Sequence, residues 1–120
     1  MSYTVQFAPE ALDQLDAIEE FIARAGSPVA AARYVDTIIA YCESLTTFPH
    51  RGIRRDDLLH GLRITSYRRS AVIAFIANTD TETVSILGIF YGGQDYEAVL
   101  LDEPGDQASS TFNGRPSLAL

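Results

Sequence analysis

Arginine is the residue type in this sequence that is best suited to binding a charged group. Six of the nine basic residues lie between positions 51 and 69, and the chain contains no lysine. A guanidinium group can donate two parallel hydrogen bonds to a phosphate or a carboxylate, but its pKa is too high for it to act as a general base. The stretch is therefore predicted to bind an anionic partner. Its arginines are Arg51, Arg54, Arg55, Arg63, Arg68 and Arg69.

The charge of this stretch is opposite in sign to that of the rest of the chain. The net charge is −7, whereas residues 51–69 hold six arginines against Asp56 and Asp57 and are locally +4, which leaves −11 elsewhere. A chain this acidic is a poor general binder of nucleic acid, because phosphate contacts supply most non-specific affinity. We therefore expect no direct binding of nucleic acid by the protein alone. One basic patch on an acidic body suits a partner with an acidic surface.

Other kinds of site have little support in the sequence. The only cysteine is Cys42, which excludes an internal disulfide bond and suits a reducing cytoplasm. His50 and His60 lack the spacing of metal ligands, so we expect no metal site. No apolar run approaches the ~18 residues that a membrane span requires, and no secretory signal pattern is present at the N-terminus. We expect a cytoplasmic protein with no cofactor and no membrane contact.

The elements that must position the arginines begin with a strand and two helices. Residues 3–7 alternate between apolar and polar types, which predicts a half-buried strand. A first amphipathic helix is predicted between Pro9 and Gly26, and a second between Pro28 and Phe48. The short turn between them predicts an antiparallel helical hairpin. The predicted apolar faces consist of Leu12, Leu15, Ile18 and Ile22 in the first helix, and of Ala31, Val35, Ile38, Cys42 and Leu45 in the second.

Three further strands complete the predicted sheet. They are expected at residues 62–67, 71–77 and 84–91, after a polar loop at 49–61. The middle run is apolar throughout, as expected of a strand that is covered on both faces. The connections are short enough for antiparallel hairpins. The predicted fold is therefore α+β, with the order β-α-α-β-β-β and a helical hairpin packed on a small, mostly antiparallel sheet.

The last part of the chain is predicted to contain one short helix and a tail. Gly92 and Gly93 end the final strand, and Asp95 is placed to cap a helix that runs to about Leu101. Residues 102–120 are rich in acidic, small and polar residues and hold few large apolar ones. We expect a domain at residues 1–101 followed by a flexible tail.

This order of elements resembles the RelE/ParE superfamily of toxins from bacterial toxin–antitoxin pairs. The similarity extends over about residues 3–101, and the segment Tyr91-Gly92-Gly93-Gln94-Asp95-Tyr96-Glu97 is most similar to the ParE branch. The resemblance implies a toxin that inhibits DNA gyrase by binding and is neutralised by a cognate antitoxin. It also implies that an extended or helical antitoxin segment, acidic and with apolar anchors, covers the toxin.

RelE-like members of the superfamily imply an alternative, because they are ribosome-dependent endoribonucleases. Such a reaction needs a proton acceptor for the 2′-hydroxyl, cations for the phosphorane and an acid for the leaving oxygen. The resemblance implies Arg63, Arg69 and Tyr91 as the catalytic candidates. The lysines that RelE-type nucleases use are absent, a histidine often stands in the place of Tyr91, and an arginine often stands in the place of Gln94. We therefore favour binding over catalysis, and a degenerate toxin that only binds its antitoxin is a third alternative.

The site predictions follow from these arguments. Antitoxin binding is assigned to the basic stretch, and target binding to the residues that follow the last strand. The antitoxin-binding candidates are Arg54, Arg55, Arg63, Arg68 and Arg69, and the target-binding candidates are Tyr91, Gln94 and Tyr96.

Overall fold

Nine elements build the domain in the computed structural model, which describes residues 3–105. The short β2 was not predicted. Helix α3 continues to Gly105, whereas the sequence predicts an end near Leu101. The elements are β1 (Thr4–Phe7), α1 (Pro9–Ala25), α2 (Pro28–Glu43), the 3-10 helix η1 (Ser44–Thr46), β2 (Ile53–Arg54), β3 (Leu62–Tyr67), β4 (Ala71–Asn78), β5 (Thr83–Tyr91) and α3 (Tyr96–Gly105).

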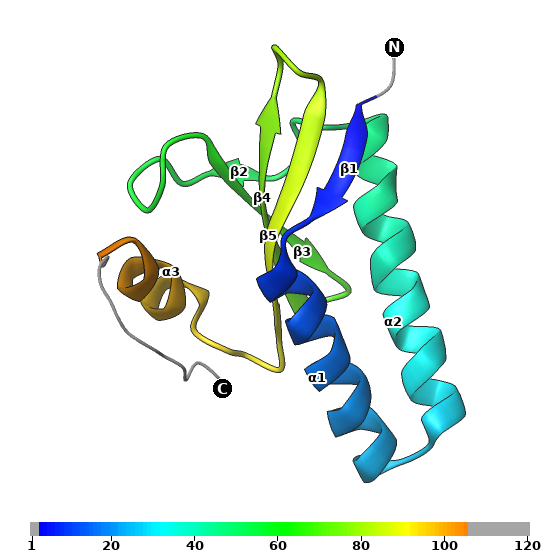
Figure 1. Ribbon diagram of the computed structural model, residues 1–120. Helices are drawn as coiled ribbons and strands as arrows, with labels where there is room; N and C mark the ends of the chain where they lie inside the picture. The colour runs from blue at the N-terminus through cyan, green and yellow to red at the C-terminus, as the bar shows by residue number, and fades with distance from the viewer. Residues whose placement is uncertain (1–2, 106–120) are drawn as a thin grey trace.

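The strands form one five-stranded sheet in the order β1-β5-β4-β3-β2. Strand β1 runs parallel to β5, with Thr4 opposite Thr83, and every other pair is antiparallel. Figure 1 shows α1 and α2 on one side of this sheet and α3 on the other. The predicted α+β fold with a helical hairpin and a mostly antiparallel sheet is confirmed.

The helical hairpin forms where the sequence supplies its caps. The Ser27 hydroxyl accepts hydrogen bonds from the backbone N–H groups of Val29 and Ala30, and Pro28 occupies the first turn of α2, where its missing N–H costs nothing. Gly26 separates the two helices. The turn therefore directs α2 back along α1, as predicted.

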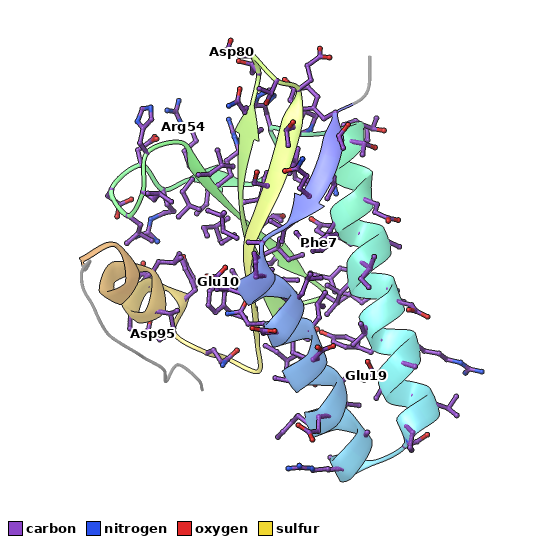
Figure 2. All side chains as sticks on the ribbon, in the orientation of Figure 1. Phe7, Glu10, Glu19, Arg54, Asp80 and Asp95 are labelled. Carbon is purple, nitrogen blue, oxygen red and sulfur yellow. The ribbon has the colours of Figure 1, made fainter. Side chains whose placement is uncertain are left out.

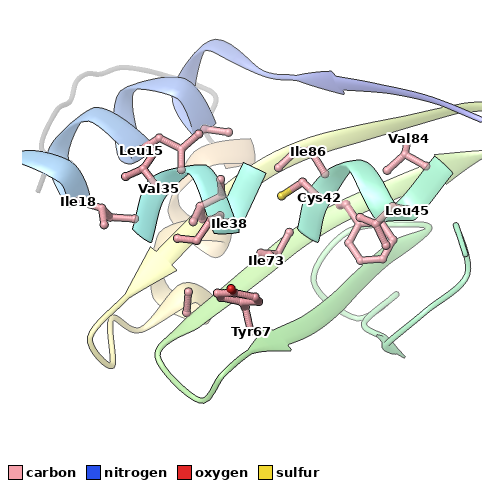
Figure 3. Packing of buried hydrophobic residues seen from close by; sticks show 14 residues of the cluster. Leu15, Ile18, Val35, Ile38, Cys42, Leu45, Tyr67, Ile73, Val84 and Ile86 are labelled. Atoms are coloured by element: carbon pink, nitrogen blue, oxygen red, sulfur yellow. The ribbon is translucent and has the colours of Figure 1, made fainter. Parts of the chain in front are cut away.

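The main core lies between the hairpin and the sheet (Figure 3). One residue differs from the predicted apolar face, because Leu12 is 49% exposed and Ala11 is buried instead. Burial raises the pKa of the Cys42 thiol to about 12, so the thiol is protonated at neutral pH and unreactive. Fully buried side chains of this core include Ile38, Cys42, Leu45, Ile73, Phe75, Val84, Ile86 and Ile89.

A second, smaller core lies on the opposite face of the sheet. Leu100 of α3 is buried there, and Tyr96 and Val99 pack against the same cluster. The strand residues that they help to cover are Leu62, Ile64, Ala74 and Phe90. Strand β4 contributes to both cores, which explains why its sequence is apolar throughout.

The segment predicted as a polar loop contains the two-residue strand β2. Ile53 pairs with Ile64 and Arg54 pairs with Arg63, which extends the sheet by one short edge strand. Gly52 makes this pairing possible, because its φ is +86° and a β-carbon there would lie 2.3 Å from the carbonyl oxygen of Ile64. Within residues 3–105, no helix is both long and apolar enough to cross a bilayer.

Candidate functional site

Two of the six arginines in the basic stretch are neutralised by acids within the same loop. The guanidinium of Arg54 lies 2.9 Å from the carboxylate of Asp56. Arg55 binds Asp57 with two parallel hydrogen bonds of 3.0 and 2.8 Å. The hydrogen bond from Arg55 lowers the pKa of the Asp57 carboxyl. The pKa of the Asp56 carboxyl is also lowered, and the largest cause is its hydrogen bond from the backbone N–H of Gly61. Figure 2 shows the side chain of Arg54, the last residue of β2.

Arg55 also connects its loop to α3. Its guanidinium lies 2.6 Å from the Glu97 carboxylate and donates a 2.9 Å hydrogen bond to the Tyr96 hydroxyl. The Tyr96 ring packs against Phe90, with ring centroids 6.2 Å apart. The hydrogen bonds to Asp57 and Glu97 raise the pKa of Arg55, so the charge is fixed. Because its donors are engaged within the domain, Arg55 is held as a structural link between the loop and α3.

The excess positive charge therefore rests on the other four arginines of the stretch. Among residues 3–100, whose side chains the structure describes, none of the four lies within 4 Å of a carboxylate oxygen. An unpaired guanidinium on the surface is free to bind a partner's carboxylate at no cost in broken ion pairs. These residues are Arg51, Arg63, Arg68 and Arg69.

Arg51 and Arg63 lie at the end of the sheet that carries β2. The Arg51 guanidinium stands 5.2 Å from the ring centroids of both Tyr41 and Phe48. Arg63 donates a 2.8 Å hydrogen bond to the backbone carbonyl of His50. Both guanidinium groups are thus held in place by uncharged partners, and their charge stays available.

Arg68 and Arg69 lie at the other end of β3, in the turn that leads into β4. Both have positive φ, 50° and 61°, and the Ser70 N–H closes the turn with a 3.0 Å hydrogen bond to the Tyr67 carbonyl. The Arg68 guanidinium lies 5.2 Å from the centroid of the Tyr67 ring. Because a strand rises ~3.4 Å per residue, this turn is about 17 Å from Arg63. The unpaired arginines therefore form two separate positive regions.

The strain at this turn leads to a stability prediction. Positive φ at both central residues is typical of type I′ turns, which favour Asn-Gly, and an arginine in this conformation costs on the order of 1 kcal/mol. We expect Arg68→Asn/Arg69→Gly to raise the free energy of unfolding by ~1 kcal/mol in urea denaturation. The control is Arg68→Ala/Arg69→Ala, which removes the same charges and keeps the strain. Equal stabilisation by the alanine pair would show that charge, rather than backbone strain, is the cause.

Tyr91 lies at the same end of the sheet as the Arg68-Arg69 turn. Its ring is 5.5 Å from Tyr34 and 6.1 Å from Phe21, measured between centroids. The Tyr34 hydroxyl is hydrogen-bonded to the Ser70 hydroxyl, and burial raises the pKa of Tyr34. Neither Phe21 nor Tyr34 is among the site residues predicted from the sequence, because an aromatic residue on a helix is ordinarily part of the core.

The three candidate nuclease residues are not gathered into one site. Arg63 on β3 lies opposite Phe75 of β4. Tyr91 on β5 lies opposite Ala71, which comes four residues before Phe75, so Arg63 and Tyr91 flank β4 on opposite sides. This places Arg63 and Tyr91 more than ~13 Å apart along the strand direction alone. Arg69 lies in the turn between β3 and β4, at the same end of the sheet as Tyr91.

The target-binding candidates lie at the end of β5 and in the segment that follows it. The side-chain oxygen of Gln94 accepts a 3.0 Å hydrogen bond from the Tyr91 N–H, and the Asp95 carboxylate accepts one from Ala98 N–H, which confirms Asp95 as the cap of α3. Gln94 is exposed, while Tyr96 is partly buried against Phe90. Figure 2 shows Asp95 at the start of α3. Within the described part of the chain, no group of three or more histidine, cysteine or acidic side chains could hold a metal ion.

A helical hairpin packed on a mostly antiparallel sheet is the fold that the resemblance to the RelE/ParE toxins implies. The sequence matches the family model described as the ParE toxin of the type II toxin–antitoxin system parDE over residues 5–96. The chain therefore belongs to the ParE toxin family. The comparison with curated protein sequences finds no match.

Solved structures with the same fold come from both branches of the superfamily. The chromosomal ParDE system of P. aeruginosa matches with a TM-score of 0.64 at 21% identity, covering 75% of this chain and 96% of that one. The RelBE2 toxin–antitoxin complex of Mycobacterium tuberculosis matches with a TM-score of 0.58 at 18% identity, covering 77% and 100%. A double arginine mutant of E. coli RelE matches with a TM-score of 0.58 at 12% identity, covering 84% and 95%.

Proposed function

We propose that this toxin acts by binding and inhibiting DNA gyrase, and that a cognate antitoxin neutralises it. The ParE family match supports the gyrase target. The observation that carries the choice of binding over catalysis is the separation of Arg63 from Tyr91 across the sheet. RNA cleavage requires a proton acceptor, a phosphate clamp and an acid around one phosphate. Arg63 and Tyr91 are instead spread over about 13 Å of backbone along the strand direction, which favours binding over catalysis.

The contact with the target is proposed at the segment that follows β5. Gln94 is exposed, and its hydrogen bond to the Tyr91 N–H gives the short connection a defined shape. Tyr96 is held by Arg55 and Phe90, so its position is defined before any partner arrives. A surface that is ordered in advance loses less conformational entropy when it binds.

The antitoxin is proposed to contact the unpaired arginines Arg63, Arg68 and Arg69. Their charges lack carboxylate partners among the described residues, whereas Arg54 and Arg55 already have them. An acidic segment crossing from one end of β3 to the other would meet both positive regions. The complementary field would also raise the rate of association.

We expect the purified protein to inhibit DNA supercoiling by gyrase and to cut no mRNA on translating ribosomes. The physical reason is that Arg63 and Tyr91, two of the three nuclease candidates, lie at different ends of the sheet and on opposite sides of β4. Both assays use the same preparation, with gyrase alone and ribosomes alone as controls, and antitoxin should reverse the inhibition. Codon-positioned cuts in a reconstituted translation reaction would contradict the proposal and favour the nuclease alternative.

A further inference from the structure

The connection between η1 and β2 forms a surface hollow that the sequence did not indicate. Its volume is about 490 Å³, and its lining consists of Thr47, Phe48, Pro49, His50 and Arg51. The Tyr3 ring contacts His50 edge to face, with centroids 6.1 Å apart. The N–H groups of Thr47 and Phe48 donate to the Ser44 carbonyl. The hollow therefore has a defined shape in spite of its place in a connection.

One wall of the hollow is apolar and open to solvent. The side chain of Phe48 is 58% exposed, although it is one of the largest apolar groups on the surface. Pro49 continues this wall. A solvated phenylalanine beside a concave surface offers apolar area that a partner's side chain can bury, at ~25 cal/mol per Å². This is the arrangement of an anchor pocket at a protein–protein interface.

The rim of the hollow carries two charges with no acid of their own among residues 3–100. Arg51 stacks between Tyr41 and Phe48, and its one hydrogen bond is a long one, 3.4 Å, to the Ser44 hydroxyl. Arg63 is fixed by its hydrogen bond to the His50 carbonyl, which belongs to the lining residue. Each guanidinium keeps further N–H donors that can bind a carboxylate. Charge and apolar area therefore meet at one place.

We propose that this hollow is the anchor pocket for one segment of the cognate antitoxin. A large apolar side chain of that segment lies against Phe48 and Pro49, and carboxylates next to it bind Arg51 and Arg63. This rests on the proposed function in one respect, namely that the toxin has a protein antitoxin. An acidic protein segment is favoured over nucleic acid, because it supplies both an apolar side chain for Phe48 and carboxylates for the arginines. It also carries fewer negative charges than a nucleic-acid backbone, which has one on every phosphate, for the −11 of the remaining chain to repel.

The test measures the affinity and dissociation rate of the toxin for the protein encoded by the neighbouring reading frame. We expect Phe48→Ser and Arg51→Ala each to raise Kd at least tenfold, mainly through faster dissociation. The matched controls are Val29→Ser, since Val29 is similarly exposed at 61%, and Arg33→Ala on the outside of α2. Both control variants should have a Kd within twofold of that of the wild-type toxin. Thermal melts check that each variant is folded.

The outcomes separate this inference from the proposed function. If the wild-type toxin forms no complex with that protein, the antitoxin part of the proposed function fails. If it forms a complex that Phe48→Ser and Arg51→Ala leave unchanged, the pocket is wrong and the proposed function stands. Equal weakening by Val29→Ser would also overturn the pocket, because the effect would then belong to any exposed apolar residue. Arg51 lies over aromatic rings at the surface, so Arg51→Ala should stay folded. Its Kd therefore tests the pocket even if Phe48→Ser unfolds.

Discussion

A chain that stops after Gly92 should lose roughly 3–6 kcal/mol of its free energy of unfolding, because two large apolar side chains lose their burial. Leu100 is buried on the sheet, and Tyr96 and Val99 pack beside it. Their removal exposes a strip of β3, β4 and β5 to water. It also leaves Arg55 with Asp57 alone, since Glu97 and Tyr96 are lost. Such a loss is a large share of the stability of a domain of this size.

The matched control is a chain that stops after Gly105. The sequence placed the domain boundary near Leu101, but α3 continues to Gly105, so the cut belongs after the helix. Residues 106–120 lie outside the described part and are poor in large apolar residues, so we expect this control to melt within a few degrees of the full chain. Urea and thermal unfolding of both truncations measure the difference. A control as unstable as the Gly92 truncation would show that the proposed boundary is wrong.

Replacing Arg63 with alanine should weaken the complex with the antitoxin by at least tenfold and speed its dissociation. The proposed contact is a desolvated pair between Arg63 and an antitoxin carboxylate, and loss of one partner of such a pair costs ~2–5 kcal/mol. Surface plasmon resonance gives both the affinity and the dissociation rate. The effect should appear mainly in the dissociation rate, because the bond forms after the two proteins meet.

Arg54 supplies the matched control for Arg63. The two residues are directly opposite each other on β2 and β3, but Arg54 already pairs with Asp56. Arg54→Ala removes the same charge from the same place and should change affinity by less than about threefold, as is usual for an exposed ion pair. An unchanged dissociation constant for the triple variant Arg63→Ala/Arg68→Ala/Arg69→Ala would refute the placement of the antitoxin.

The helices and main strands could be predicted because their signals are local. Proline, serine and glycine mark the ends of the hairpin helices, and alternation marks the strands. The error at Leu12 has a local cause as well. Leu12 and Ala11 are neighbours on the helix, and hydrophobicity favours leucine as the core residue, yet Ala11 is fully buried and Leu12 is 49% exposed.

The division of the arginines into paired and unpaired sets could not be predicted. The partner of Arg55 on α3 is Glu97, which is 42 positions away, and only the packing of α3 on the sheet brings them together. Strand β2 has two residues, too few to show any periodicity. The sequence therefore located the positive charge within residues 51–69, but it could not show which of these arginines are paired with acids in the folded domain.

The parallel pairing of β1 with β5 has a consequence for how the domain assembles. It joins Thr4 to Thr83, so the first strand finds its partner only when the last strand is present. Pairings between distant parts of a chain have high contact order, and they slow folding because the loop must close before the contacts form. Until then, the edges of β1 are unsatisfied and exposed to other chains. A nascent polypeptide that lacks β5 thus has no partner for β1 and no completed sheet.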